Sequence, residues 1–261
     1  MGVLNVTPDS FSDGGRFDSV SAAYDRALQL FEDGAGMVDI GGESTRPGAS
    51  PVSVQEELDR VIPVIEAIRK TSDGFLSVDT SNPEVMKAAV SAGADMINDI
   101  RALTRPDALS VAVDLAVPVC LMHMQGTPGD MQDAPKYGSV VEDVFQFLAA
   151  RKNACINAGL AEENFILDPG FGFGKTLGHN LDLLANLSQF HQLGSPVLVG
   201  VSRKSMFGQL LGRPVDDRLA GTVAATVIAA QQGCAVIRVH DVKESVDAIK
   251  LVVATREYRN G

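Results

Sequence analysis

Polar side chains stand at the ends of short apolar segments along this chain, and some of them suit the binding of a polar ring. Asp79, Asn98, Asp168 and Lys204 come from four such ends. A carboxylate can accept two parallel N–H bonds from an amidine-like edge, and asparagine offers both a donor and an acceptor. A ligand without matching groups would leave buried polar atoms unpaired, at about 1–3 kcal/mol each. Acid–base catalysis is the alternative for two carboxylates, and the residues leave both interpretations open.

Basic residues at other segment ends suit an anion. Arg238 and His240 alternate as residues of a strand do, so they face the same side. Arginine and histidine together suit a phosphate or a diphosphate. Arg46 lies in the glycine-rich stretch Gly41–Gly48, which would bring it and backbone N–H groups to the same place. A solvated surface pair is the alternative for these basic residues.

The first residues of the chain run from an apolar segment straight into a stretch rich in side-chain oxygens. Asn5, Asp9 and Asp13 are hard oxygen ligands, which favour Mg²⁺ over zinc. The histidines show neither HxxxH nor HExxH spacing, so we expect no zinc site.

Two further motifs stand at segment ends. Gly170–Lys175 lacks the spacing of a Walker A motif, so it predicts a tight loop, with Phe171 as an aromatic wall for a flat ligand. Ser202–Ser205 precedes a short predicted helix, whose N-terminus would attract a carboxylate or phosphate. A simple serine N-cap is the alternative, and both can hold together.

Not every polar strand end needs a ligand to explain it. Capping of a helix or holding of a turn is sufficient for Asp39 and Ser202. Asp79 and Asp168 each follow a fully apolar segment, so we expect these carboxylates to be partly buried and to need hydrogen-bond donors.

These residues are positioned by alternating strands and helices. The predicted strands are Val3–Val6, Met37–Ile40, Phe75–Val78, Met96–Ile97, Val117–Leu121, Phe165–Leu167, Val197–Val199 and Val236–Val239. The predicted helices are Val20–Glu32, Val54–Lys70, Pro83–Ala92, Asp107–Val113, Val140–Ala158, Leu181–Leu187, Met206–Leu211, Asp216–Gln232 and Val242–Arg256. This rhythm is typical of an α/β protein with a (β/α)8 TIM barrel, although an open doubly wound sheet alternates in the same way. Polar strand ends favour the barrel, because they converge on one mouth.

Composition narrows the class of protein. The 261 residues contain no linker or low-complexity tract, so we expect residues 1–261 to form a single domain. The net charge of −11 argues against a nucleic-acid partner and an anionic membrane surface. The three cysteines form no CxxC pair, which indicates reduced thiols. No signal peptide and no apolar run of about 18 residues is found, so we expect a soluble, cytoplasmic protein.

The motifs together resemble one family over essentially the whole chain, the dihydropteroate synthases of bacterial folate synthesis. The matching segments are Gly2–Gly15, Asp39–Gly48, Ser77–Ser81, Ile97–Ile100, Leu121–Gln125, Leu167–Lys175, Gly200–Ser205 and Arg238–Val242. The resemblance implies a pterin-binding TIM barrel. It implies a transferase that condenses 7,8-dihydropterin-6-ylmethyl diphosphate with 4-aminobenzoate to give 7,8-dihydropteroate and diphosphate. Sulfonamides would be competitors, and a homodimer is implied.

The resemblance also assigns roles to residues of this chain. The pterin would be held by Asp79, Asn98, Asp168, Lys204, Arg238 and Met122. Diphosphate would contact Thr45, Arg46, Arg238 and His240, and Asn5 would bind Mg²⁺. The 4-aminobenzoate would be enclosed by Phe11, Asp13, Arg46, Pro47, Phe171 and Ser205. Catalysis would rest on Asp168, Lys204, Arg238 and Asn5. Relatives have a strand or hairpin ahead of Gly2, so the expectation is that a leading segment is missing here.

The implied chemistry needs no strong general base. Diphosphate leaves readily once its charge is neutralised, which Mg²⁺, Arg238 and His240 could do. We therefore hypothesise an SN1-like path through a methylene cation, with Asp168 stabilising the charge. One competing interpretation is the pterin barrel of corrinoid-dependent methyltransferases, which has no reason to carry a diphosphate and Mg²⁺ set. The other is a non-enzymatic pterin-binding barrel.

Overall fold

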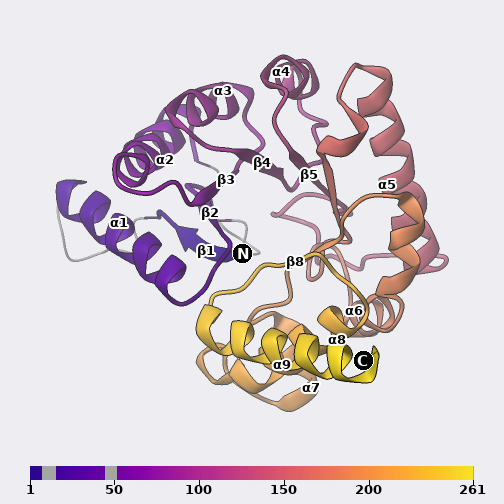
Figure 1. The fold of residues 1–261 in the computed structure, drawn as a ribbon. Coiled ribbons are helices and arrows are strands. Elements are labelled where there is room, and N and C mark those ends of the chain that lie inside the picture. Colours follow the sequence, from indigo (N-terminus) through magenta and orange to yellow (C-terminus); the bar gives the residue numbers. More distant parts are fainter. Residues whose placement is uncertain (8–15, 45–51, 261) are drawn as a thin grey trace.

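Short parallel strands form a cylinder at the centre of the protein, and helices surround it (Figure 1). The computed structural model describes residues 1–7, 16–44 and 52–260. Within these ranges the strands are β1 Gly2–Asn5, β2 Met37–Gly41, β3 Phe75–Asp79, β4 Met96–Asp99, β5 Val119–Met122, β6 Phe165–Asp168, β7 Leu198–Val199 and β8 Val236–Ile237. Each predicted strand is present, within one or two residues at its ends.

Hydrogen bonds close the cylinder. Strands β1 to β6 pair in parallel in chain order, and β7 pairs with β8. At one seam the Leu167 N–H donates to the Pro196 carbonyl over 2.9 Å, which joins β6 to β7. At the other, the Val3 N–H donates to the Val239 carbonyl over 3.0 Å, which joins β8 to β1. The predicted (β/α)8 barrel is therefore confirmed.

The helices fill the sequence between the strands. Within the described ranges they are α1 Arg16–Glu32, α2 Val54–Arg69, α3 Pro83–Ala92, α4 Ala108–Leu115, α5 Val140–Asn157, α6 Leu177–Ala185, α7 Ser205–Leu211, α8 Leu219–Gln231 and α9 Val242–Asn260. Short 3-10 turns lie at η2 Glu162–Asn164, η3 Leu187–Leu193 and η4 Val215–Asp217.

Several predicted helix boundaries were wrong, at α1 and α9 among others, and two of these errors have a clear structural cause. Helix α6 begins at Leu177 rather than Leu181, because the Thr176 hydroxyl accepts the His179 N–H over 3.2 Å and caps it. The predicted helix 216–232 is divided, because η4 ends at Asp217 and α8 begins only at Leu219. Both errors come from capping and tight turns, which an apolar pattern does not report.

An apolar layer plugs the N-terminal end of the barrel interior. Its side chains, which come from positions around the cylinder, are Met1, Phe75, Met96, Cys120, Ile166, Leu198 and Val236. Side chains alternate across a strand, so residues two positions further on face the same interior. Asn98, Asp168 and Arg238 occupy such positions, directly above this layer. The barrel interior is therefore apolar at its base and polar towards its mouth.

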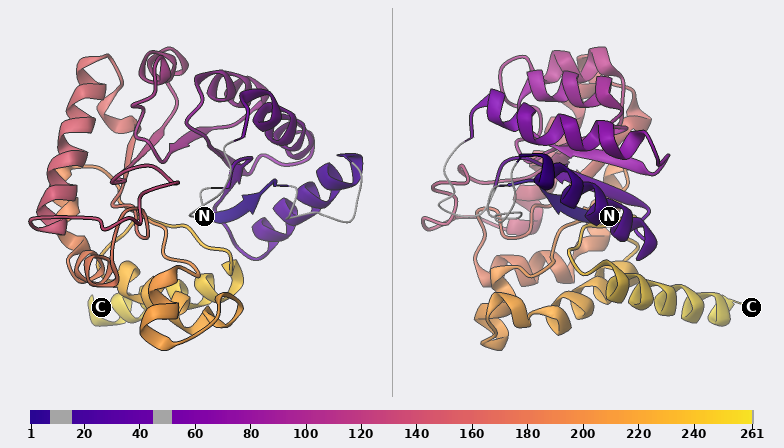
Figure 2. Two further views of the ribbon diagram at one scale, coloured as in Figure 1. Left: turned by 180° about the vertical axis from the view of Figure 1, so that it is seen from behind. Right: turned by 90° about the vertical axis from the view of Figure 1, so that its left-hand side faces the viewer.

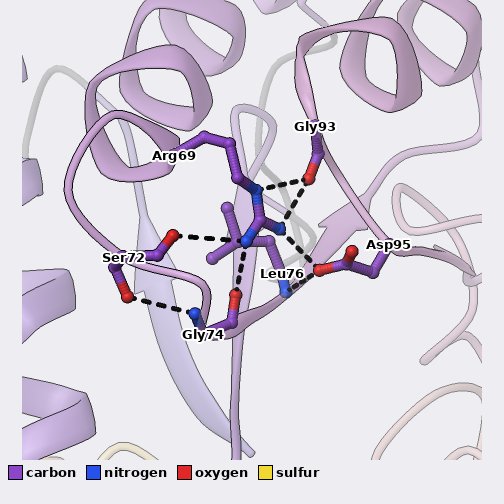
Figure 3. A network of polar contacts seen from close by, with 6 residues as sticks. All are labelled: Arg69, Ser72, Gly74, Leu76, Gly93 and Asp95. Carbon is purple, nitrogen blue, oxygen red and sulfur yellow. Dashed lines mark hydrogen bonds and ion pairs between the residues drawn. The ribbon is translucent and has the colours of Figure 1, made fainter.

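Arg69 joins the chain segments at the base of the barrel (Figure 3). It lies at the C-terminal end of α2, and its guanidinium donates to the carbonyls of Gly74 and Gly93, each at 2.9 Å. It also pairs with Asp95 at 2.6 Å, and the same Asp95 oxygen accepts the Leu76 N–H at 2.8 Å. One side chain thereby fixes the turns that enter β3 and β4, which sets the register of these strands.

The mouth lies at the opposite end, where the strands end. Figure 2 (right) shows the long connection between β5 and α5 projecting there, while α9 ends on the other side. No helix in the described part of the chain is both long and apolar enough to cross a membrane.

Candidate functional site

A partly buried arginine bridges two carboxylates at the centre of the barrel mouth. Arg238 follows β8, and its Nε donates to Asp39 Oδ2 over 2.6 Å while its Nη2 donates to Asp79 Oδ2 over 2.9 Å. The Asp39 side chain is 0% exposed, and that of Asp79 is 12% exposed. Asn98 Nδ2 donates to the same Asp39 oxygen over 3.1 Å. Strands β2, β3, β4 and β8 thus meet in one polar network.

The interpretation of Asp39 as a capping or turn residue was wrong. Asp39 lies in the middle of β2, between the buried residues Val38 and Ile40, and faces the barrel interior. Its Oδ1 atom is buried without a hydrogen-bond partner among the described residues. A charged residue inside an apolar strand was the signal available in the sequence, since a buried charge requires a partner.

The crowding of carboxylates alters their protonation. Burial raises the pKa of Asp79 to about 7, with Asp39 adding to the rise and Arg238 opposing it. Burial alone would lower the pKa of Arg238, but Asp39 and Asp79 outweigh it and raise that pKa above its usual range. The guanidinium therefore stays charged while Asp79 can take up a proton near neutral pH.

Asp168 and Lys204 form the other side of the mouth. Asp168 is 6% exposed, and its Oδ1 accepts the Gly170 N–H over 2.7 Å. Burial raises the pKa of Asp168, while this hydrogen bond and Lys204 oppose the rise. The Lys204 Nζ atom lies 4.2 Å from the ring centroid of Phe173. Burial and Arg238 lower the pKa of Lys204 to about 8.

Phe173, and not the predicted Phe171, lies beside Lys204 at the mouth. Phe171 is 1% exposed and packs in the main hydrophobic core, so no ligand reaches its ring in this structure. Phe173 instead contacts Lys204 and packs beside Met122, which ends β5 and is 3% exposed. The glycine-rich loop turns through left-handed backbone at Gly170 and Gly172, with φ of 72° and 77°. Those turns decide which ring faces the mouth, and the sequence pattern does not fix them.

His240 is oriented by Ser202 and not by a carboxylate. The Ser202 hydroxyl accepts the His240 backbone N–H at 3.1 Å and lies 3.0 Å from its Nδ1 atom. Ser202 lies in the predicted turn, which the Lys204 N–H closes by donating to the Val201 carbonyl over 3.3 Å, and its hydroxyl contacts His240 as well. Burial, followed by Arg238 and Arg203, lowers the pKa of His240 to about 4, so its imidazole is neutral at pH 7. The Arg203 guanidinium pairs with Asp241 at 2.5 Å, away from this network.

The remaining predicted residues are placed less centrally. Asn5 ends β1 and is half-buried, and its amide has no hydrogen-bond partner in the described part of the chain. Ser205 is exposed and is the first residue of α7, whose N-cap is Lys204, so the predicted serine N-cap was wrong. Six predicted residues lie outside the described residues: Asp9, Phe11, Asp13, Thr45, Arg46 and Pro47.

A single half-buried amide fits a magnesium ion better than a transition metal. The described residues hold no cluster of three or more histidine, cysteine or acidic side chains that could bind a metal. Magnesium keeps several waters and is bound through one or two protein oxygens together with substrate phosphates. Asn5 could supply such an oxygen at the end of β1, the strand that meets the segment carrying Arg238 and His240 at the barrel seam.

Comparisons with known proteins agree on one family. The family described as "Pterin binding enzyme" matches residues 1–240. The dihydropteroate synthase of Escherichia coli K12 is 55% identical over 255 residues, which cover 98% of this chain and 90% of that protein. The Yersinia pestis dihydropteroate synthase, solved with a sulfonamide drug complex, is 54% identical with a TM-score of 0.94, covering 98% and 94% of the chains. The Xanthomonas albilineans enzyme in complex with 7,8-dihydropteroate is 50% identical with a TM-score of 0.90, covering 98% and 92%.

The ion network predicts that loss of Asp39 destabilises the protein. Asp39→Ala should lower the free energy of unfolding by about 3–5 kcal/mol, because it leaves a partly buried guanidinium with one carboxylate fewer. Urea denaturation followed by circular dichroism measures this change.

The matched control is Asp217→Asn, which removes the charge from an exposed ion pair with Arg213 whose side chains are 60% and 62% exposed. It should change the free energy of unfolding by less than about 0.5 kcal/mol. Equal effects of the two variants would contradict the structural importance of Asp39.

Proposed function

Because the chain belongs to the dihydropteroate synthases of the pterin-binding enzyme family, we propose that its barrel mouth performs their reaction with the residues described above. The family, the transferase class and the synthesis of dihydropteroate for folate, all predicted from the sequence, are confirmed by these matches. The residue roles, the metal, the dimer and the cellular location are our proposals. The observation that carries the assignment of the residues is the convergence of Asp79, Asn98, Asp168, Lys204 and Arg238 on one mouth.

The pterin edge binds between the two carboxylate groups of the mouth. Asp168 Oδ2 and Asp79 Oδ1 have no hydrogen-bond partner among the described residues, so both can accept N–H bonds from the ring. Asn98 adds an amide beside them, and Met122 supplies apolar contact. Two acceptors on separate strands recognise a heterocycle with N–H groups on two edges, and they reject one without them.

The diphosphate lies on the side of Arg238 and His240. The Nε and Nη2 atoms of Arg238 donate to Asp39 and Asp79, and its Nη1 donors have no partner among the described residues. A phosphate beside the neutral His240 raises the pKa of its imidazole, because a nearby negative charge favours the imidazolium. Thr45 and Arg46 complete this subsite in our proposal.

Bond breaking precedes bond formation in the proposed mechanism. The C–O bond to diphosphate breaks first, with the electron pair leaving on the diphosphate held by Arg238 and His240. The positive charge left on the methylene carbon spreads into the pterin, and the Asp168 carboxylate stabilises it through the ring edge. The amine of 4-aminobenzoate then forms the C–N bond, and its proton passes to diphosphate or water.

We propose Mg²⁺ as the cofactor, held by Asn5, diphosphate oxygens and water. The unpaired Asn5 amide and the absence of a carboxylate cluster in the described residues support this choice. When bound, the ion neutralises charge on the leaving diphosphate. Asn5 itself fixes the ion at the end of β1, on the Arg238 side of the mouth.

The second substrate lies over Lys204 and Phe173. The exposed Ser205 at the start of α7 and the charged Lys204 suit the carboxylate of 4-aminobenzoate, while Phe173 offers its ring. We propose Phe173 in this place instead of Phe171, which is buried in the core. Phe11, Asp13 and Pro47 remain proposed members of the same subsite. Sulfonamides compete for it.

A second copy of this chain covers an apolar surface made by α7, α8 and α9, which lie together on one side of the barrel (Figure 1). We call it the α7–α9 surface. Its exposed side chains are Leu210, Leu211, Val215, Leu219, Ile228, Leu251, Val253 and Tyr258. Such a surface on a monomer would favour association, so we propose a homodimer. A cytoplasmic location suits this biosynthetic role and the free thiols of the described cysteines.

Asp168→Asn should reduce turnover severely without unfolding the protein. We expect kcat/KM for the pterin diphosphate to fall at least about 100-fold, because the charge that stabilises the cation is lost. A coupled assay of dihydropteroate formation measures this, and circular dichroism checks the fold. Near-normal kinetics would remove Asp168 from the mechanism.

The same variant tests the order of bond breaking. With oxygen-18 in the bridging position and no 4-aminobenzoate present, the wild-type protein should scramble the label into non-bridging positions, and Asp168→Asn should do so more slowly. A wild-type protein that turns over but never scrambles the label contradicts the dissociative path.

The imidazole of His240 should report diphosphate directly. In the free protein it should titrate near pH 4, and diphosphate with Mg²⁺ should raise its pKa by about one unit or more. NMR titration of labelled histidine measures both values.

The internal control is His123, whose pKa is lowered to about 3 by burial and by Lys175. Its titration should not move on addition of diphosphate, because it faces Lys175. A shift at His123 equal to that at His240 would contradict the proposed diphosphate site.

The α7–α9 surface predicts a dimer that charge disrupts. Wild-type protein should sediment as a dimer at micromolar concentration, and the double variant Leu210→Asp, Leu251→Asp should sediment as a monomer. Leu181→Asp is the matched control, because Leu181 is 37% exposed but lies on α6, outside this surface. Dissociation by the control, or a dimeric double variant, would contradict this interface.

A further inference from the structure

A buried lysine closes the loop that carries Asp168 and Phe173. Lys175 is 3% exposed, and its Nζ atom lies 2.9 Å from the Gly170 carbonyl oxygen and 3.0 Å from that of Phe173. The third short contact, 3.0 Å, is to Nδ1 of His123. An ammonium has three N–H donors, so these acceptors account for all of them. The side chain is therefore fully engaged in one geometry.

These contacts join two neighbouring loops of the mouth. His123 follows β5, while Gly170 and Phe173 belong to the loop after β6. The two backbones touch, because a Cβ added to Gly170 would collide with the His123 carbonyl and one added to Gly174 would collide with the Gln125 carbonyl. Lys175 lies at this junction, and its ammonium contacts three acceptors that come from both loops.

The loop after β6, held in this way against the loop after β5, sets the position of two groups that the proposed reaction uses. The Gly170 N–H holds Asp168 Oδ1 at 2.7 Å, and the Gly170 carbonyl is held by Lys175. The Phe173 carbonyl is held in the same way, and the Phe173 ring lies under the Lys204 ammonium at 4.2 Å. Displacement of the Lys175 ammonium would thus move both a carboxylate and a cation of the pterin site.

We propose that Lys175 is a positioning residue, which fixes Asp168 and Lys204 for the pterin by binding the carbonyls of Gly170 and Phe173 against His123. This inference rests on the proposed function of the barrel mouth. Lys175 itself touches no substrate in this assignment, because its donors are all directed to protein acceptors. A lysine that only stabilises the fold is the alternative.

The chain offers a matched control for that alternative. Lys152 is 5% exposed, and its Nζ donates to the Leu193 carbonyl over 2.9 Å and to Glu162 over 3.2 Å. It joins α5 to η2 and η3, outside the mouth. Both lysines are buried and bind backbone carbonyls, so loss of either should cost stability, but only Lys175 should affect the kinetics.

The experiment compares Lys175→Met, Lys152→Met and Phe173→Leu, with thermal unfolding and steady-state kinetics for the pterin diphosphate. Lys175→Met should lower kcat/KM by about 10- to 100-fold, as expected for displaced catalytic groups. Lys152→Met should stay within about twofold of wild type while losing thermal stability. The double variant that combines Lys175→Met with Phe173→Leu should have a kcat/KM no more than about threefold below that of the worse single variant. The reason is that both changes act through the position of the Lys204 ammonium.

Several outcomes overturn the proposal. They are equal kinetic losses for the two lysine variants, or losses of Lys175→Met and Phe173→Leu that multiply in the double variant. If Lys175→Met does not fold, Lys175→Gln, which keeps two donors, takes its place in the same comparison. If neither folds, the role of Lys175 is structural and the proposal is wrong. A wild-type protein that makes no dihydropteroate refutes the proposed function instead.

Discussion

The guanidinium of Arg238, held between Asp39 and Asp79, is the interaction on which the mouth depends. Its partners lie on β2 and β3, while Arg238 follows β8, so the ion pairs cross the seam where the first and last strands meet. Replacing such a pair with apolar residues can be neutral, but removing one partner is costly, because a charge is left buried. The ion pairs can therefore form only when the barrel is closed, because closure brings Arg238 next to Asp39 and Asp79.

The same network affects how the mouth accepts an anionic substrate. Among the described residues, the cations Arg238, Lys204 and Lys175 face the carboxylates Asp39, Asp79 and Asp168, so their charge is largely offset before any ligand binds. These carboxylates suit a pterin that donates N–H bonds. Burial raises the pKa of both Asp79 and Asp168, and Asp39 adds to the rise at Asp79. Diphosphate therefore needs positive charge from elsewhere, which is the physical reason to propose a divalent cation beside Asn5.

Strand ends were predictable from the sequence because apolar runs followed by polar residues report where a strand leaves the core. That pattern located Asp79, Asn98, Asp168, Lys204 and Arg238 in one mouth. The pattern did not report which way each side chain points or which residue it contacts. Asp39 was assigned to a turn because its Arg238 partner is 199 residues away. Choosing Phe173 over Phe171 required knowledge of the left-handed turns at Gly170 and Gly172, which depend on contact with the loop after β5.

Two kinds of constraint therefore act at the two ends of the barrel. At the base, apolar side chains fill the interior and Arg69 fixes the turns that enter β3 and β4, which is a matter of stability. At the mouth, charged groups lie close together, and glycines allow backbones to touch. A site of closely spaced charges tends to rearrange, so it needs rigid support from below and internal donors such as Lys175 beside it. In the proposed assignment the ligands would supply what is missing: ring N–H groups for the free carboxylate oxygens and an anion for the remaining Arg238 donors.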